Sequence, residues 1–85
     1  MSQERPVRPL PAIKLGIYRH YKGQRYQVYG VARHSETLEP VVVYRPLYGE
    51  GALWVRPYAM FMGTVLLDGV EHARFAWVEG LDPVN

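Results

Sequence analysis

The 85-residue chain has room for one domain, and its formal net charge is only +2. It contains no cysteine, which excludes disulfide staples and thiol nucleophiles and leaves any metal site to histidine and carboxylate ligands. No apolar run approaches the roughly 20 residues that span a bilayer, and the N-terminus lacks a signal-peptide core, so we expect a soluble, cytoplasmic protein with no membrane partner.

The first 15 residues are predicted to form a tail. Pro6, Pro9 and Pro11 disfavour a helix or a central strand here and favour an extended, polyproline-like chain. Such a segment is either a flexible arm or a strap that packs along a groove. We therefore place the folded domain at residues 16–79 and a second, C-terminal tail at 80–85.

Two strand-like runs follow, at residues 16–21 and 25–33. The short gap between them contains Gly23, which is typical of a β-hairpin. A polar connection then ends at Pro40, and a valine-rich run occupies residues 41–45. Because hydrophobic and polar residues do not alternate in this last run, we predict a strand that is buried on both sides.

The second half of the chain contains three further predicted strands and one helical turn. A strand over 53–56 ends at Pro57, and the apolar residues after this proline predict a single helical turn. A strand over 64–67 leads into the Asp-Gly pair at 68–69, the strongest hairpin signal in the chain. The last predicted strand returns from that pair over 70–78.

Five or six short strands with turns about every 8–12 residues are typical of an all-β barrel or sandwich. Closing the sheet would also remove the exposed edge strands that a small β domain tolerates poorly. One helical turn between the fourth and fifth strands is the layout of small SH3-like barrels. We therefore predict an all-β, five- or six-stranded SH3-like or Sm-like barrel with one short helical turn.

Signals for catalysis or metal binding are weak in this sequence. Ser35 lies between His34 and Glu36, but neighbouring side chains of an extended chain point to opposite faces, so His34 is poorly placed to act as its base. His34 and Glu36 share a face, and His20 could join them in acid/base work. A small enzyme or enzyme accessory built on these residues is one alternative, although we expect no catalytic residue, metal or cofactor.

The strongest pattern combines basic and aromatic residues. Residues 1–33 carry seven Lys or Arg and one acid, whereas residues 34–85 carry three Arg and seven acids. Cations interleaved with rings suit single-stranded nucleic acid, but a small barrel also needs rings in its core and arginines that cover them. The candidate ligand-binding residues are Tyr18, Arg19, His20, Arg33, His34, Glu36, Trp54 and Arg56.

These observations predict a non-enzymatic binding module. Its ligand is expected to be single-stranded nucleic acid, such as RNA, or a nucleotide-like molecule. The alternatives are a protein partner, or a second copy of the chain that buries the exposed rings.

A series of short motifs, in order along the chain, resembles a known family. They are YRHYKG at 18–23, ARHSET at 32–37, LEP at 38–40, VVY at 42–44, LYG at 47–49, LWVRP at 53–57 and MF at 60–61. Together they resemble a bacterial family known only as domain of unknown function 1653, over about residues 16–78. The resemblance implies an SH3-like or Sm-like barrel and brings no established activity, cofactor or catalytic residue.

The resemblance is most marked in the polar connection at residues 33–37, together with residues 18–21 and 54–57. Because polar loop residues contribute little to a core, this segment is either a binding site or a loop held by its own hydrogen bonds to backbone. The Sm-like analogy implies ring assembly and RNA, although the sequence has no clear Sm-type Asp/Asn loop pattern or glycine-rich RNA loop.

Overall fold

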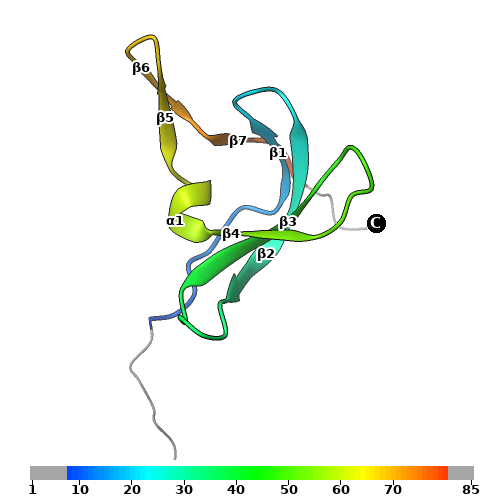
Figure 1. The fold of residues 1–85 in the computed structure, drawn as a ribbon, viewed down its shortest axis with the longest axis vertical. Helices are drawn as coiled ribbons and strands as arrows, with labels where there is room; N and C mark the ends of the chain where they lie inside the picture. Colours follow the sequence, from blue (N-terminus) through cyan, green and yellow to red (C-terminus); the bar gives the residue numbers. More distant parts are fainter. Residues whose placement is uncertain (1–7, 81–85) are drawn as a thin grey trace, which may run out of the picture.

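The computed structural model describes residues 8–80 and shows a mostly β protein (Figure 1). In this part of the chain the elements are β1 (Gly16–His20), β2 (Arg25–Arg33), β3 (Pro40–Pro46), β4 (Trp54–Pro57), α1 (Tyr58–Phe61), β5 (Thr64–Leu67), β6 (Val70–Ala73) and β7 (Phe75–Glu79). No helix in the described segment is long and apolar enough to cross a membrane.

The strands form two antiparallel sheets. Five strands follow the order β4-β3-β2-β1-β7, and β5 pairs with β6 in a separate two-stranded sheet. The larger sheet is strongly curved in Figure 1, but within residues 8–80 no ladder joins its edge strands, β4 and β7. The mostly β fold is therefore confirmed, whereas the closed barrel is not.

Most local predictions are confirmed. β2 and β5 match their predicted ranges, β1 and β2 form the predicted hairpin, and the helical turn follows Pro57. At the second predicted hairpin, Asp68 and Gly69 have φ angles of 52° and 77°. Both residues are left-handed, which is the conformation that a two-residue hairpin turn of type I′ requires.

The predicted strand over 70–78 is wrong as a single element, because Arg74 divides it into β6 and β7. The backbone N–H of Arg74 donates to the carbonyl of Gly63, and its carbonyl accepts from the N–H of Tyr21, both at 3.0 Å. The first contact continues the β5–β6 register by one residue and the second continues the β1–β7 register, so the chain changes partner strand at Arg74. β6 therefore stays with β5, β7 crosses to β1, and the described chain has seven strands.

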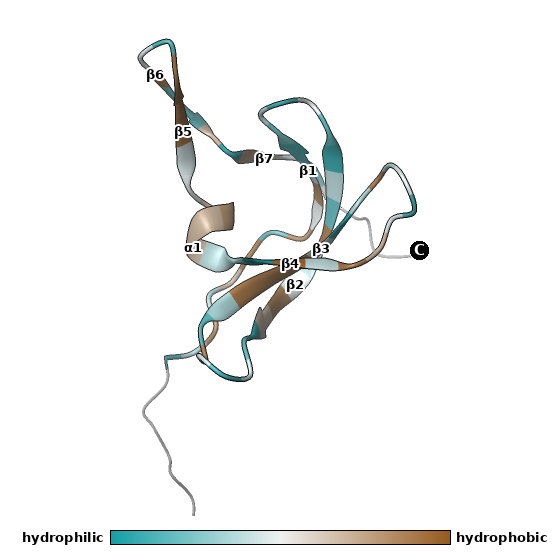
Figure 2. Cartoon of the chain, viewed as in Figure 1, coloured by the Kyte–Doolittle hydropathy of each residue, from teal (hydrophilic) through white to brown (hydrophobic). Residues whose placement is uncertain are grey.

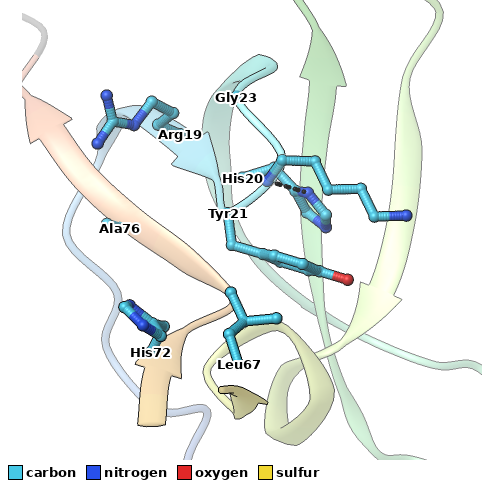
Figure 3. A pocket seen from close by; sticks show the side chains of 9 residues that line it. Arg19, His20, Tyr21, Gly23, Leu67, His72 and Ala76 are labelled. Atoms are coloured by element: carbon cyan, nitrogen blue, oxygen red, sulfur yellow. Dashed lines mark hydrogen bonds between the residues drawn. The ribbon is translucent and has the colours of Figure 1, made fainter. Parts of the chain in front are cut away.

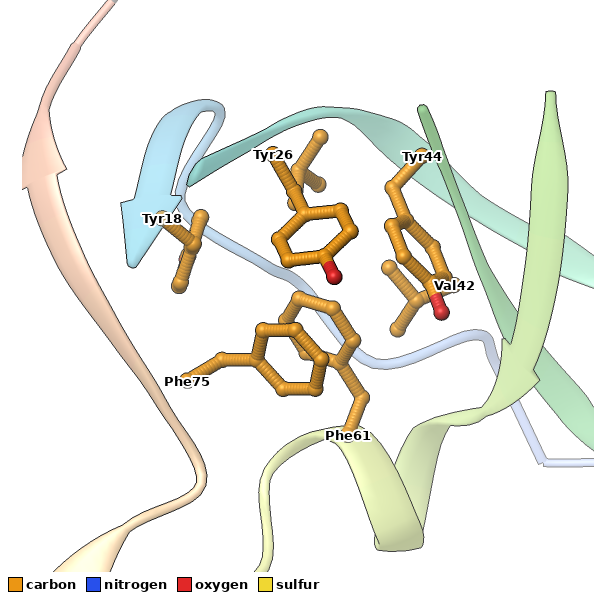
Figure 4. Close-up of a cluster of buried hydrophobic side chains, with 7 residues drawn as sticks. Tyr18, Tyr26, Val42, Tyr44, Phe61 and Phe75 are labelled. Carbon is orange, nitrogen blue, oxygen red and sulfur yellow. The ribbon is translucent and has the colours of Figure 1, made fainter. Parts of the chain in front are cut away.

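The core lies between one face of the five-stranded sheet and α1 (Figure 4). We call this face of the sheet the inner face. Phe61 from α1 is fully buried and stacks on Phe75 from β7, with ring centroids 4.1 Å apart and planes 5° apart. The cluster also contains Tyr18, Tyr26, Val28, Val42 and Tyr44.

The valine run behaves as its composition predicts. The neighbouring residues Val41 and Val42 are both buried, at 8% and 0% exposure, although they point to opposite faces of β3. β3 also lies inside the sheet, between β2 and β4, so both of its edges are paired, and the valine run forms a hydrophobic stretch of this strand in Figure 2.

The N-terminal segment 8–15 has no regular structure but packs against the sheet. The carbonyl of Lys14 accepts from the Tyr18 hydroxyl at 2.7 Å, the carbonyl of Leu15 accepts from the Trp77 indole at 3.2 Å, and Ile13 packs on the core. Of the two alternatives for this segment, the structure shows the packed strap. Residues 1–7 and 81–85 lie outside the described residues, and the domain limits stay a prediction.

Candidate functional site

Besides Tyr18, which is buried in the core, three of the eight predicted ligand-binding residues gather around the inner face of the sheet. Trp54 is paired with the core residue Tyr44, and Arg56 is paired with Val42. His20 is paired with Phe75 on the opposite side of the same core. Paired residues in antiparallel strands share a face, so all three side chains point inward.

Tyr26 lies at the centre of this group. Its ring centroid lies 6.3 Å from that of Trp54, 6.4 Å from that of His20 and 5.7 Å from that of Tyr48. Trp54 is 43% exposed and Tyr48 is 45% exposed, so both offer an accessible ring. The inner-face cluster is defined as His20, Tyr26, Tyr44, Tyr48, Trp54 and Arg56.

Arg56 is held in place by neutral groups. Its Nε donates to the Tyr44 hydroxyl at 3.1 Å, one Nη contacts the sulfur of Met60 at 3.6 Å, and its guanidinium carbon lies 5.6 Å from the centre of the Phe75 ring. None of these partners carries a negative charge. The guanidinium is therefore oriented by the fold, and its charge remains available to an anion.

The charges of three cations act on His20. Burial lowers the pKa of this imidazole, and the positive charges of Arg56, Lys22 and Arg74 lower that pKa further. The Nε of Arg74 is buried and has no hydrogen-bond acceptor within the described residues. This end of the inner-face cluster is thus a locus of positive charge around a neutral imidazole.

The lowered pKa of His20 predicts a loss of stability in acid. The unfolded chain binds a proton at the ordinary histidine pKa of 6.5, above the pKa in the folded protein. The contribution of His20 to the free energy of unfolding is therefore fully present above this pH. It is lost as the pH falls through the pKa of His20 in the folded protein. Urea unfolding measured from about pH 8 to about pH 5 checks this, because histidine titrates in that range.

Two histidine variants provide the comparison. His20→Gln should weaken the acid dependence of the free energy of unfolding, whereas His72→Gln, at an exposed position on β6, should retain it. An identical acid dependence in wild type and His20→Gln would contradict the assignment.

The tyrosine hydroxyls of the cluster supply neutral polar groups. Tyr26 and Tyr48 share a hydrogen bond of 2.9 Å between their hydroxyl oxygens. Burial, and secondly this bond, raise the pKa of Tyr26 to about 12. Its hydroxyl stays protonated at neutral pH, so the cluster adds hydrogen-bonding groups without negative charge.

Next to this cluster, a pocket of about 450 Å³ lies between the β1–β2 turn and the β5–β6 hairpin (Figure 3). Its basic lining residues are Arg19, His20, Lys22 and His72. His20 therefore belongs to both the cluster and the pocket.

The other predicted residues serve the fold or lie elsewhere. Tyr18 is buried in the core.

The guanidinium of Arg33 donates to the carbonyls of Leu38 at 3.0 Å and Arg8 at 2.9 Å. The Nδ1 of His34 accepts from the backbone N–H groups of Glu36 and Thr37 at 3.1 and 3.2 Å. Of the two readings of the connection at 33–37, these contacts favour the loop held by its own hydrogen bonds.

The acid/base alternative requires His20, His34 and Glu36 to meet. His20 precedes β2 and His34 follows it, and a nine-residue strand is about 30 Å long. The fold therefore gives these groups no shared site. Within the described part of the chain, no group of three or more His, Asp or Glu side chains is arranged to hold a metal ion.

Comparison with known proteins identifies one family. The model of the family described as protein of unknown function (DUF1653) matches residues 16–77. The chain is also similar to a crystal structure of a protein belonging to DUF1653 from Bordetella bronchiseptica, with 38% identity and a TM-score of 0.73. That match covers 85% of this chain and 95% of the other. No curated protein matches the chain.

Proposed function

The chain belongs to the DUF1653 family, as its motifs predict, and we propose that it is a non-enzymatic binding module for single-stranded nucleic acid. One observation carries the proposal: accessible rings of Trp54 and Tyr48 lie in the same cluster as the positive charge around His20. We place the ligand on this inner-face cluster.

The two halves of the cluster suit the two parts of a nucleotide. An exposed aromatic ring stacks on a base of any sequence, and such stacking is worth about 1–3 kcal/mol per base. Lys22, Arg56 and Arg74 can neutralise phosphates, since no carboxylate is among the charges that act on His20. The hydroxyls of Tyr26 and Tyr48 can hydrogen-bond to bases or sugars.

The finer architecture supports the same proposal. We propose that the fold is an opened SH3-like barrel. The larger sheet is curved, a helical turn lies between β4 and β5, and β7 returns to pair with β1. Small barrels of several kinds bind oligonucleotides on a sheet face between loops. RNA in the cytoplasm is the ligand we propose.

The direct test is binding of a labelled single-stranded RNA of roughly ten nucleotides, which suits one small barrel. Fluorescence anisotropy at several salt concentrations should show affinity falling steeply with salt. Three neutralised phosphates predict a log–log slope of about −2, at ~0.7 per phosphate for single strands. Undetectable binding, or binding that does not depend on salt, would refute the proposal.

Trp54→Ala should weaken RNA binding by about 1–3 kcal/mol, or roughly 5- to 150-fold, because it removes the accessible stacking surface. Its salt slope should stay that of the wild type, since no charge is lost. Trp77→Ala is the matched control. Trp77 is 39% exposed, but the ammonium of Lys14 lies 3.5 Å from the centre of its ring and occupies that surface. Equal losses in the two variants would mean that Trp54 has no special role.

A further inference from the structure

We propose that the pocket beside the β1–β2 turn is a second binding site, which takes a small phosphomonoester with a planar apolar body, the chemistry of a mononucleotide. This inference goes beyond the RNA-binding proposal, because most of the side chains that line the pocket have no role in that proposal. Apart from His20 and Lys22, no residue that lines it takes part in the inner-face binding proposed above.

The pocket has the size of a ligand site. Its volume of about 450 Å³ lies within the range of roughly 300–1,000 Å³ that is usual for small-molecule pockets. Small residues from three elements line it, namely Gly23, Ala73 and Ala76. The room exists because these positions carry no bulky side chain.

The charges that line the pocket have one sign. Arg19 and Lys22 are permanent cations, His20 and His72 add imidazole groups, and no carboxylate is among the lining residues. A guanidinium presents a planar fork of donors that matches phosphate oxygens, and an ammonium adds a point charge. An anion with several oxygens is therefore the complementary ligand.

The apolar part of the lining lies beside the charged part. Figure 3 shows Arg19 and His72 on either side of Ala76, and the side chains of Tyr21 and Leu67, which also line the pocket, lie near each other. Ala76 is paired with Arg19 across the β1–β7 ladder, so its methyl group leaves the guanidinium uncovered. A phosphate can lie near Arg19 while a planar ring rests on Tyr21 and Leu67.

The pocket can be altered without touching the inner-face cluster. Arg19 alternates with Tyr18 and His20 along β1, so its side chain leaves the sheet on the opposite face. Ala76 is an exposed strand residue, where a larger β-branched side chain is compatible with the backbone. Ala76→Ile should fill the pocket, and Arg19→Gln should remove its fork while keeping a polar side chain.

The test is an NMR titration of the full chain with adenosine monophosphate, inorganic phosphate, and RNA oligomers that carry either a 5′-phosphate or a 5′-hydroxyl. We expect saturable shifts of the Gly23, Ala73 and Ala76 amides with adenosine monophosphate or with the 5′-phosphorylated strand. Shifts with the free nucleotide assign a free metabolite as the source of the phosphomonoester, and shifts with the 5′-phosphorylated strand alone assign a strand end.

Arg19→Gln should weaken this binding by roughly tenfold or more, about the value of one charge-assisted hydrogen bond. Ala76→Ile should weaken it at least as much, because the larger side chain occupies the space of the ligand. Ala52→Ile, which adds the same bulk at an exposed position outside the pocket, should bind as the wild type does. No saturable shift with any of the phosphates, or equal affinity in all three variants, would overturn the inference. Binding of the 5′-hydroxyl strand reports separately on the inner-face cluster, and Ala76→Ile should leave it unchanged.

Discussion

Phe61→Ala is expected to unfold most of the protein under conditions in which the wild type is folded. The Phe61 ring is fully buried, stacks on Phe75, and meets the edges of Tyr18 and Tyr44 at centroid distances of 5.4 and 5.3 Å. Truncating a buried phenylalanine to alanine costs about 3–5 kcal/mol. One small hydrophobic core supplies only ~3–5 kcal/mol in a domain of this size, so the loss is comparable with the whole stability.

The adjacent residue on the same helical turn provides the control. Met60 is 49% exposed, and Met60→Ala should change the free energy of unfolding by about 0.5 kcal/mol or less. Circular dichroism during urea unfolding distinguishes the two variants. If the free energy of unfolding of Phe61→Ala lies within ~1 kcal/mol of the wild-type value, the packing of α1 on the core does not stabilise the fold as proposed.

Local sequence predicts the turns of this fold better than it predicts the pairing of distant strands. The helical turn is visible in the sequence because Pro57 immediately precedes it, and the hairpin at 68–69 is visible because Asp-Gly suits left-handed backbone. Sheet closure is different, because it depends on pairing between strands far apart in the chain. The break at Arg74 has the same origin, since there the chain leaves its hairpin partner β5 and pairs with the distant strand β1.

The sequence likewise predicts part of the candidate site and not the rest. Trp54 and Arg56 are two residues apart on one strand, so the sequence alone predicts that they share a face. That His20 meets the same core follows from the β1–β7 register, which no local pattern specifies.

For Arg33 and His34 the sequence leaves a ligand site and a loop held by its own hydrogen bonds both open. In the structure, backbone groups of the connection that begins at Arg33, together with the Arg8 carbonyl, hydrogen-bond to these two side chains and favour the second. Tyr48 and Arg74 are not among the residues predicted from the sequence, because each lies outside a strand; tertiary structure alone brings Tyr48 into the cluster and Arg74 close to His20.

Arg56→Ala should reduce RNA affinity by roughly 10- to 150-fold, the equivalent of about 1.5–3 kcal/mol for hydrogen bonds to a charged group. It should also reduce the magnitude of the log–log salt slope by ~0.7, because one phosphate contact is lost. The physical reason is that Tyr44 and Met60 orient this guanidinium without neutralising it. Anisotropy titrations at several salt concentrations measure both quantities.

Arg56→Lys separates the charge of this residue from its fork of donors. The ammonium keeps a phosphate contact, so the salt slope should remain that of the wild type. It cannot reproduce both the bond to Tyr44 and a paired contact to phosphate, so affinity should still fall by about tenfold. Arg45→Ala removes the same charge from the opposite face, where Arg45 donates to Tyr29 and Gln27, and should bind RNA almost as the wild type does. If Arg45→Ala and Arg56→Ala lose affinity equally, binding follows net charge alone, and the inner-face cluster is not the site.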